Sequence, residues 1–128
     1  MISVGEPSRC AIEAGDFFEG VPPGGDLYVL CQILHDWNDA SCLKILRNCR
    51  ATMAAEARLL VIERVLDLKP GKTDPTSFLS DMDMMVLFPG AKERTLLEFT
   101  DLFRQTGFAE PKLIPTRSVF SILETAPR

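Results

Sequence analysis

The side chains best suited to acid–base chemistry stand directly after two apolar segments of the sequence. His35 and Asp36 follow residues 26–34, and Glu63 follows residues 59–62. A carboxylate beside an imidazole orients the ring and favours its charged form, which makes the imidazole a better general base. We therefore interpret His35 and Glu63 as a candidate pair for proton transfer. In the plainer alternative, His35 caps a strand or a helix and Glu63 ends a strand at the surface.

A strand, helix, strand unit is predicted to position this pair. Residues 26–34 are apolar almost throughout, as is typical of a strand covered on both faces in a parallel sheet. From Asn38 or Asp39, either a suitable N-cap, apolar residues recur at the spacing of one helical face. They are Cys42, Ile45, Leu46, Cys49 and Met53. Residues 59–62 form the second strand, and such a crossover makes the strands parallel, so the proposed pair meets at one edge of the sheet.

Two further helices are predicted in the second half of the chain. Residues 77–88 place apolar side chains on one side of a helix, after a loop rich in Pro and Gly. Thr95 and Glu98 form a capping box, and the helix that they begin is expected to end at Gly107.

The remaining strands complete an α/β pattern. A brief strand is expected through Ile12. Residues 112–116 and 119–125 are predicted to form an antiparallel hairpin at the sheet edge, because Pro115 cannot donate a hydrogen bond to a central strand. Strands that alternate with helices and finish in a late hairpin predict an α/β sheet.

Length and charge restrict the class of protein. With 128 residues, 46% of them hydrophobic, the chain has room for one globular core, so a single domain over residues 1–128 is predicted. The net charge of −4 gives no basic surface for nucleic acid. No apolar segment approaches the roughly 18 residues that cross a bilayer, and the N-terminus lacks a signal core. We expect a cytoplasmic protein with no membrane or nucleic-acid partner.

The four cysteines, Cys10, Cys31, Cys42 and Cys49, are predicted to be reduced and mostly buried. No two of them form a CxxC pair, and the chain has a single histidine, so a zinc site of Cys and His ligands is not expected. No metal is predicted.

Four segments together resemble a known family. They are GDFFEGVPPGGDLYVLCQILHDWNDASCLKILRNC, LLVIERVL, DMDMMVLFPGAKERT and FTDLFRQTGF. They are similar to the C-terminal part of the S-adenosylmethionine-dependent O-methyltransferases of the caffeate and acetylserotonin type, which carry an HDW motif. The resemblance covers about residues 10–125. It implies a partial doubly wound, Rossmann-like methyltransferase sheet with a C-terminal antiparallel hairpin.

The resemblance implies catalytic roles for four residues. His35 of the HDW motif takes the position of the family's general base, which accepts the proton of the substrate hydroxyl as the methyl group is transferred. Glu63 and Glu93 take the positions of two glutamates that hold this histidine. Asp36 follows the base as it does in the family and helps to position it.

The resemblance also implies a cofactor site and an acceptor site. Asp16 and Phe17 of GDFF take the positions that contact the adenine of S-adenosylmethionine. Cys31, four residues before the base, takes a position whose backbone lies near the cofactor. Met84, Met85 and Phe88 take positions that line the pocket of a small aromatic or polyketide-like acceptor, and a Met-rich wall suits a flat ring. The alternative for the two methionines is a place in a helix core.

The sequence departs from the family at its start. The resemblance begins after the positions of the N-terminal dimerisation domain and of the first strands with their Gly-rich cofactor loop, so we expect these parts to be missing. Two functions remain open: methyl transfer from S-adenosylmethionine to an acceptor hydroxyl, and a catalytically silent fragment or interaction module. A dehydrogenase fragment is disfavoured, since no GxGxxG motif with a following acidic strand end is found. An unpaired sheet edge would favour a homo-oligomer.

Overall fold

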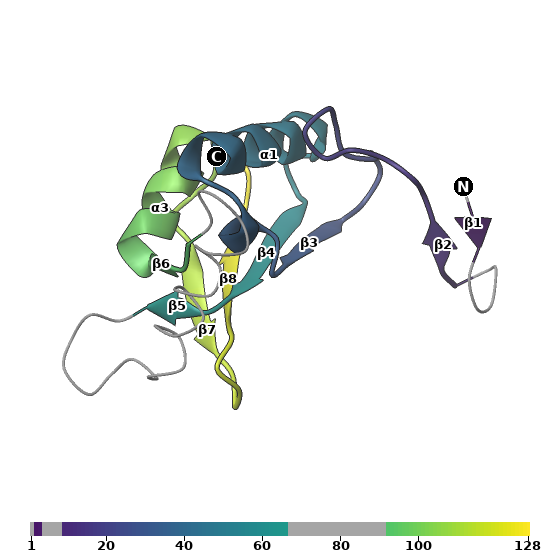
Figure 1. The fold of residues 1–128 in the computed structure, drawn as a ribbon. Coiled ribbons are helices and arrows are strands. Elements are labelled where there is room, and N and C mark those ends of the chain that lie inside the picture. The colour runs from purple at the N-terminus through teal and green to yellow at the C-terminus, as the bar shows by residue number, and fades with distance from the viewer. Residues whose placement is uncertain (1, 4–8, 67–91) are drawn as a thin grey trace.

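The computed structural model describes residues 2–3, 9–66 and 92–128 of the chain. Its centre is a four-stranded sheet in the order β3-β4-β8-β7 (Figure 1). The strands are β3 (Leu27–Cys31), β4 (Arg58–Glu63), β7 (Lys112–Pro115) and β8 (Ser121–Thr125). The predicted α/β sheet is therefore present in the described residues.

The pairing of the strands follows the sequence prediction. Strands β3 and β4 run parallel, with Cys31 opposite Ile62, so their carboxyl ends lie at the same edge. Strand β8 runs antiparallel to β4 and to β7. Strand β7 is an edge strand of the sheet and contains Pro115. Proline has no N–H to donate, and at an edge this costs no hydrogen bond between central strands.

Helix α1 (Asp39–Thr52) connects the two parallel strands. The side chain of Asn38 accepts a hydrogen bond from the backbone N–H of Ser41, which caps the helix at one of the two predicted residues. Its buried face consists of Cys42, Ile45, Leu46 and Cys49, as the spacing predicted. This face packs toward the sheet.

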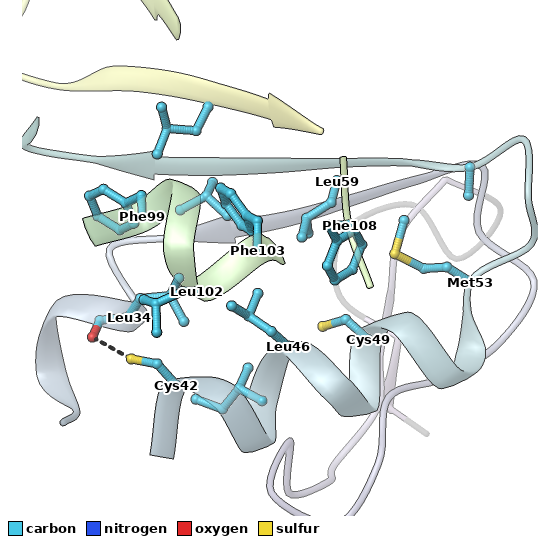
Figure 2. Packing of buried hydrophobic residues seen from close by; sticks show 14 residues of the cluster. Leu34, Cys42, Leu46, Cys49, Met53, Leu59, Phe99, Leu102, Phe103 and Phe108 are labelled. Atoms are coloured by element: carbon cyan, nitrogen blue, oxygen red, sulfur yellow. Dashed lines mark hydrogen bonds between the residues drawn. The ribbon is translucent and has the colours of Figure 1, made fainter. Parts of the chain in front are cut away.

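Helix α3 (Leu96–Gln105) lies beside α1 on the same face of the sheet (Figure 1). The predicted capping box is formed by Thr95 and Glu98, and Gly107 ends the helix region with a φ of 85°, a conformation that glycine adopts without strain. Figure 2 shows Phe99, Leu102 and Phe103 from α3 meeting Leu46 from α1 and Leu59 from β4 in one hydrophobic cluster. Burial of each such side chain contributes roughly 1.5–3 kcal/mol to folding.

Five short elements complete the described structure. Strands β1 (Ile2–Ser3) and β2 (Ala11–Ile12) form an antiparallel pair away from the main sheet (Figure 1). Strands β5 (Val65–Leu66) and β6 (Arg94–Thr95) form a parallel pair, and η1 (Leu34–Asp36) is one turn of 3-10 helix after β3. Within the described parts of the chain, no helix is long and apolar enough to cross a membrane.

Two expectations differ from the structure. Strand β3 is not covered on both faces in the described residues, since Leu27 is 54% exposed and Val29 is 50% exposed. The reason is that α1 and α3 lie on one face of the sheet (Figure 1), and no described helix covers the face that carries Leu27 and Val29. The cysteines are free, but Cys10 and Cys31 are exposed, so only half of them are buried. The helix predicted over residues 77–88 lies outside the described residues.

Candidate active site

The chain leaves the strand direction directly after β3. Gln32 has a φ of 56°, which is uncommon for a residue with a side chain, and its N–H donates to the carbonyl of Ile62 at 2.9 Å. The turn η1 follows and contains His35. This irregular backbone at the end of β3 brings His35 to the end of β4, where Glu63 lies.

Three carboxylates surround the imidazole of His35. The Nδ1 atom lies 3.3 Å from Oε2 of Glu63 and 3.5 Å from Oε1 of Glu93, and Nε2 lies 3.2 Å from Oδ1 of Asp36. The backbone N–H of His35 also donates to Oε1 of Glu63 at 3.3 Å. The side chains of Glu63 and Glu93 are buried, whereas that of His35 is 12% exposed. The structure thus brings together all four residues of the implied catalytic set.

The three carboxylates change the protonation of His35. The pKa of His35 is raised from 6.5, chiefly by the hydrogen bond to Glu93 and further by the negative charges of Glu63, Glu93 and Asp36, while burial opposes the change. Burial raises the pKa of Glu63 to about 7, and the charge of Glu93 adds to the effect while His35 opposes it. The pKa values of both groups are thus raised, that of His35 by its carboxylate neighbours and that of Glu63 by burial.

The same cluster has the ligand types of a metal site. His35, Glu63 and Glu93 each offer an atom within 4.8 Å of the others. A histidine ligates a metal through an unprotonated nitrogen, which is also the form that a general base requires. The contacts of Nδ1 with Glu63 and Glu93 are equally those of an acid–base cluster, so these ligand types do not by themselves indicate a metal.

Sequence reasoning missed a second set of contacts around His35. The backbone N–H of Lys92 donates to the carbonyl of His35 at 3.0 Å. Arg94 is fully buried and donates to the carbonyls of Leu34 and Trp37, which flank the turn. In the sequence, these contacts are indicated only by the position of Lys92 and Arg94 on either side of Glu93. Charged residues in a loop are usually solvated, so this position does not predict burial.

A cleft of about 630 Å³ lies between the segment 13–22 and β3. Asp16 and Phe17 line it together with Tyr28 and Val29, whereas Cys31 is exposed and is not among its lining residues. The segment is fixed locally, since Oδ1 of Asp16 accepts from the N–H of Phe18 at 2.9 Å. The cleft has both a carboxylate and an aromatic ring, which suit a nucleoside.

Aromatic contacts connect this cleft with the turn that carries His35. The ring of Phe18 lies 4.7 Å from that of Trp37, and the ring of Phe17 lies 6.3 Å from it, both edge to face. Asn48 of α1 donates to the carbonyl of Phe17 at 2.9 Å. The implied adenine contacts and the implied base thus belong to one packed unit. The implied acceptor residues Met84, Met85 and Phe88 lie outside the described residues.

The sequence of the chain is similar to a described protein family and to individual curated proteins. The family model described as O-methyltransferase domain matches residues 1–109. The chain is similar to the phenazine O-methyltransferase PhzM of Lysobacter antibioticus, with 43% identity over 127 residues, which cover 99% of this chain and 36% of that protein. It spans about a third of the length of the curated relatives that it matches.

Solved structures show the same arrangement of elements. The structure of LaPhzM has a TM-score of 0.89 and 44% identity, over 97% of this chain and 36% of that one. The structure of NcsB1 from neocarzinostatin biosynthesis was solved in complex with S-adenosylmethionine and 2-hydroxy-5-methyl naphthoic acid. It has a TM-score of 0.81 and 35% identity, over 94% of this chain and 34% of that one.

Proposed function

Because this chain belongs to the O-methyltransferase domain family, we propose that it takes part in methyl transfer from S-adenosylmethionine to a hydroxyl group of a small aromatic or polyketide-like acceptor. The prediction of an α/β methyltransferase fold is confirmed by the solved relatives. The observation that carries the proposal is the imidazole of His35 between the buried carboxylates of Glu63 and Glu93 at the end of the parallel strands. Residues 1–128 would form the C-terminal part of a class I methyltransferase catalytic domain.

In this proposal, His35 accepts the proton of the acceptor hydroxyl at Nε2. Its Nδ1 atom faces the buried carboxylates of Glu63 and Glu93, so Nε2, which contacts the partly exposed Asp36, is the nitrogen that would meet a substrate. Asp36 lies beside Nε2 and would help to orient the ring and the incoming hydroxyl. An ordinary imidazole has a pKa near 6.5 and a phenol a pKa near 10. The raised pKa of His35 reduces the difference between the pKa of the base and that of the acceptor hydroxyl, which favours proton transfer. The oxygen–carbon bond forms as the sulfur–carbon bond breaks, and the hydroxyl proton passes to Nε2.

The cleft at Asp16 and Phe17 is the proposed place of the cofactor's adenine. A carboxylate can accept hydrogen bonds from an amino group or a hydroxyl, and the ring of Phe17 offers an apolar surface for a base. A backbone contact at Cys31 would complement them. When bound, S-adenosylmethionine supplies a methyl group on a positively charged sulfur. The residues of the chain bind and orient it in line with the acceptor.

The acceptor is proposed to be a small aromatic or polyketide-like hydroxyl compound. The similar protein NcsB1 was solved with a naphthoic acid, and similar curated proteins are named for phenazine and mitomycin methylation. Met84, Met85 and Phe88 are proposed to line the acceptor pocket. We further propose that the protein acts in the cytoplasm as a homo-oligomer, without a nucleic-acid or membrane partner.

Replacement of His35 tests the proposed function. His35→Ala is expected to lower turnover roughly 10²- to 10⁴-fold at saturating cofactor, because the acceptor proton then has no positioned base. The control is Arg47→Ala on the exposed side of α1, which should keep full turnover. Calorimetric titration with S-adenosylhomocysteine should give the same binding to all three proteins. Full turnover by His35→Ala would show that the base assignment is wrong.

A second function is favoured by the exposed edge of the sheet. Among the described residues, β3 pairs only with β4, and Leu27 and Val29 are half exposed. A catalytically silent fragment or interaction module would use such an edge to bind a partner strand. The preceding part of a relative, supplied as a separate chain, distinguishes the two functions. Methyl transfer by the mixture supports a split enzyme, whereas a stable but inactive complex supports the interaction module.

A further inference from the structure

Arg94 is a buried cation in contact with the turn that carries His35. Its side chain is 0% exposed. Nη1 donates to the carbonyl of Leu34 at 3.0 Å, and Nη2 donates to the carbonyl of Trp37 at 2.8 Å. Nε donates to Oδ1 of Asp39 at 3.0 Å. A guanidinium is rarely buried unless it is paired, and here all three nitrogens have partners.

The partners of Arg94 lie on both sides of His35 in the chain. Leu34 directly precedes His35, Trp37 follows it by two residues, and Asp39 is the first residue of α1. One planar group therefore fixes the beginning of the turn, its end and the start of the next helix. His35 itself is held from the same segment, because the N–H of Lys92 donates to its carbonyl.

Arg94 is also the chain neighbour of a residue that holds the imidazole. Glu93 reaches Nδ1 of His35 at 3.5 Å, while the side chain of Arg94 reaches the backbone of the turn. The backbone of the turn and the ring that it carries are thus fixed by consecutive residues. A change at Arg94 would move the ring relative to Glu63 and Glu93 together.

We propose that Arg94 is a positioning residue: its guanidinium holds the turn of residues 34–37 so that His35 faces Glu63 and Glu93. The catalytic consequence rests on the proposed function, whereas the placement of His35 does not. The alternative is a structural role through the ion pair with Asp39, whose side chain is 57% exposed. An ion pair with a solvent-exposed partner contributes little net stability, which favours a geometric role.

The geometry requires arginine rather than any cation. The carbonyls of Leu34 and Trp37 accept from separate nitrogens of one rigid plane. Lysine has a single ammonium on a flexible chain and does not reproduce such a fork. Arg94→Lys therefore keeps the charge and loses the geometry, which makes it the decisive variant.

The single histidine of the chain gives a direct readout of its placement. The charged groups that face its ring are Glu63 from β4, Glu93 from the segment before β6, and Asp36 from η1 itself. In an NMR titration, Arg94→Lys and Arg94→Met are expected to lower the pKa of His35 toward 6.5, since the ring moves away from Glu63 and Glu93. Removal of a cation by itself would raise this pKa, so the direction separates positioning from a charge effect.

Methyl transfer gives a second readout. Both variants are expected to lower kcat about 10²-fold with little change in KM, as for a small misplacement of a reacting group. Arg104→Met is the matched control, because Arg104 is an exposed arginine near the end of α3 and should keep the wild-type titration and kcat. If the wild-type protein transfers no methyl group, the proposed function fails, and the titration alone still decides the role of Arg94.

The proposal remains testable if one variant does not fold. Loss of the buried guanidinium in Arg94→Met can unfold the chain, but Arg94→Lys retains the charge beside Asp39. Circular dichroism establishes that each variant is folded. A wild-type pKa of His35 and a wild-type kcat in folded Arg94→Lys would overturn the proposal, because a cation of any shape would then suffice. A rise of the pKa of His35 in Arg94→Met would overturn it as well.

Discussion

At the scale of single residues, the imidazole of His35 is surrounded by three carboxyl groups. Glu63 and Glu93 are buried, and both reach Nδ1, while Asp36 lies at Nε2. The result is a base with a raised pKa beside a carboxyl group whose pKa is raised to about 7. A base whose pKa lies near the working pH is well matched to general acid–base chemistry.

The free energy of unfolding is expected to fall as the pH rises from 5 to 8. The folded pKa of Glu63, about 7, lies above its ordinary value of 4.5, so its stabilising effect is complete below 4.5 and is lost as the pH rises through 7. His35 acts in the same direction, since its pKa is raised above 6.5. At about 1.4 kcal/mol per pKa unit, the loss from Glu63 is on the order of 3 kcal/mol. Urea unfolding at several pH values measures it.

Glu63→Gln is expected to flatten this pH dependence, because the buried group then has no proton to lose. Glu56→Gln is the matched control, since Glu56 is exposed and its replacement should leave the wild-type slope unchanged. A wild-type chain whose free energy of unfolding rises between pH 5 and 8 would contradict the placement of Glu63 in a buried cluster.

The sequence identified part of this site from physical reasoning alone. The pairing of His35 and Glu63 followed from two apolar strands that end at the same edge of a parallel pair. Glu93 came only from the resemblance, because nothing in its local pattern indicates that a residue 58 positions beyond His35 folds back onto it. Arg94 was missed since a charged residue is expected at the surface, and only the three-dimensional structure shows the carbonyls that it meets.

At the scale of elements, the two described α-helices, α1 and α3, followed the sequence closely. Local signals were sufficient for them: Asn38 caps α1, and Thr95 with Glu98 caps α3. Strand β3 was less predictable. Its apolar residues indicated burial, but they do not show which part of a protein covers them. The left-handed backbone of Gln32 could not be predicted either, because glutamine rarely adopts this conformation.

The capping box of α3 is expected to stabilise the part of the fold that carries Arg94. In Thr95→Ala, the N–H of Glu98 loses its hydroxyl acceptor, and the free energy of unfolding should fall by about 1 kcal/mol. The midpoint of urea unfolding measures the change. Thr95→Ser keeps the hydroxyl and should remain within a few tenths of a kcal/mol of the wild type. Equal loss in both variants would mean that the cap contributes nothing.

At the scale of the whole molecule, the sheet of the described residues ends in two edge strands, β7 and β3. Strand β7 contains Pro115, which has no N–H to offer a further strand, whereas β3 has no proline and carries the exposed side chains of Leu27 and Val29. Such an edge is a template for pairing with another strand. The cluster around His35 lies at the carboxyl end of β3, so a strand that pairs with β3 would lie close to the site.

The chain is expected to self-associate through β3. Val29→Lys places a charge on the open edge and should convert associated chains to monomers, as lysines do on natural edge strands. Sedimentation velocity over a range of concentrations measures the association. Leu97→Lys is the control, because Leu97 is 81% exposed on α3, away from the edge, and its replacement should leave association unchanged. A wild-type chain that sediments as a monomer throughout contradicts this prediction.

The most direct test of the site is the pKa of His35 in the wild-type chain, measured by NMR titration from pH 5 to 9. The chain has one histidine, so a single imidazole signal reports on the cluster without an acceptor or a cofactor. The contacts with Glu63 and Glu93 predict a midpoint above 6.5. A midpoint at or below 6.5 in a folded chain would mean that the carboxylates do not hold His35, and the proposed general base would lose its physical foundation.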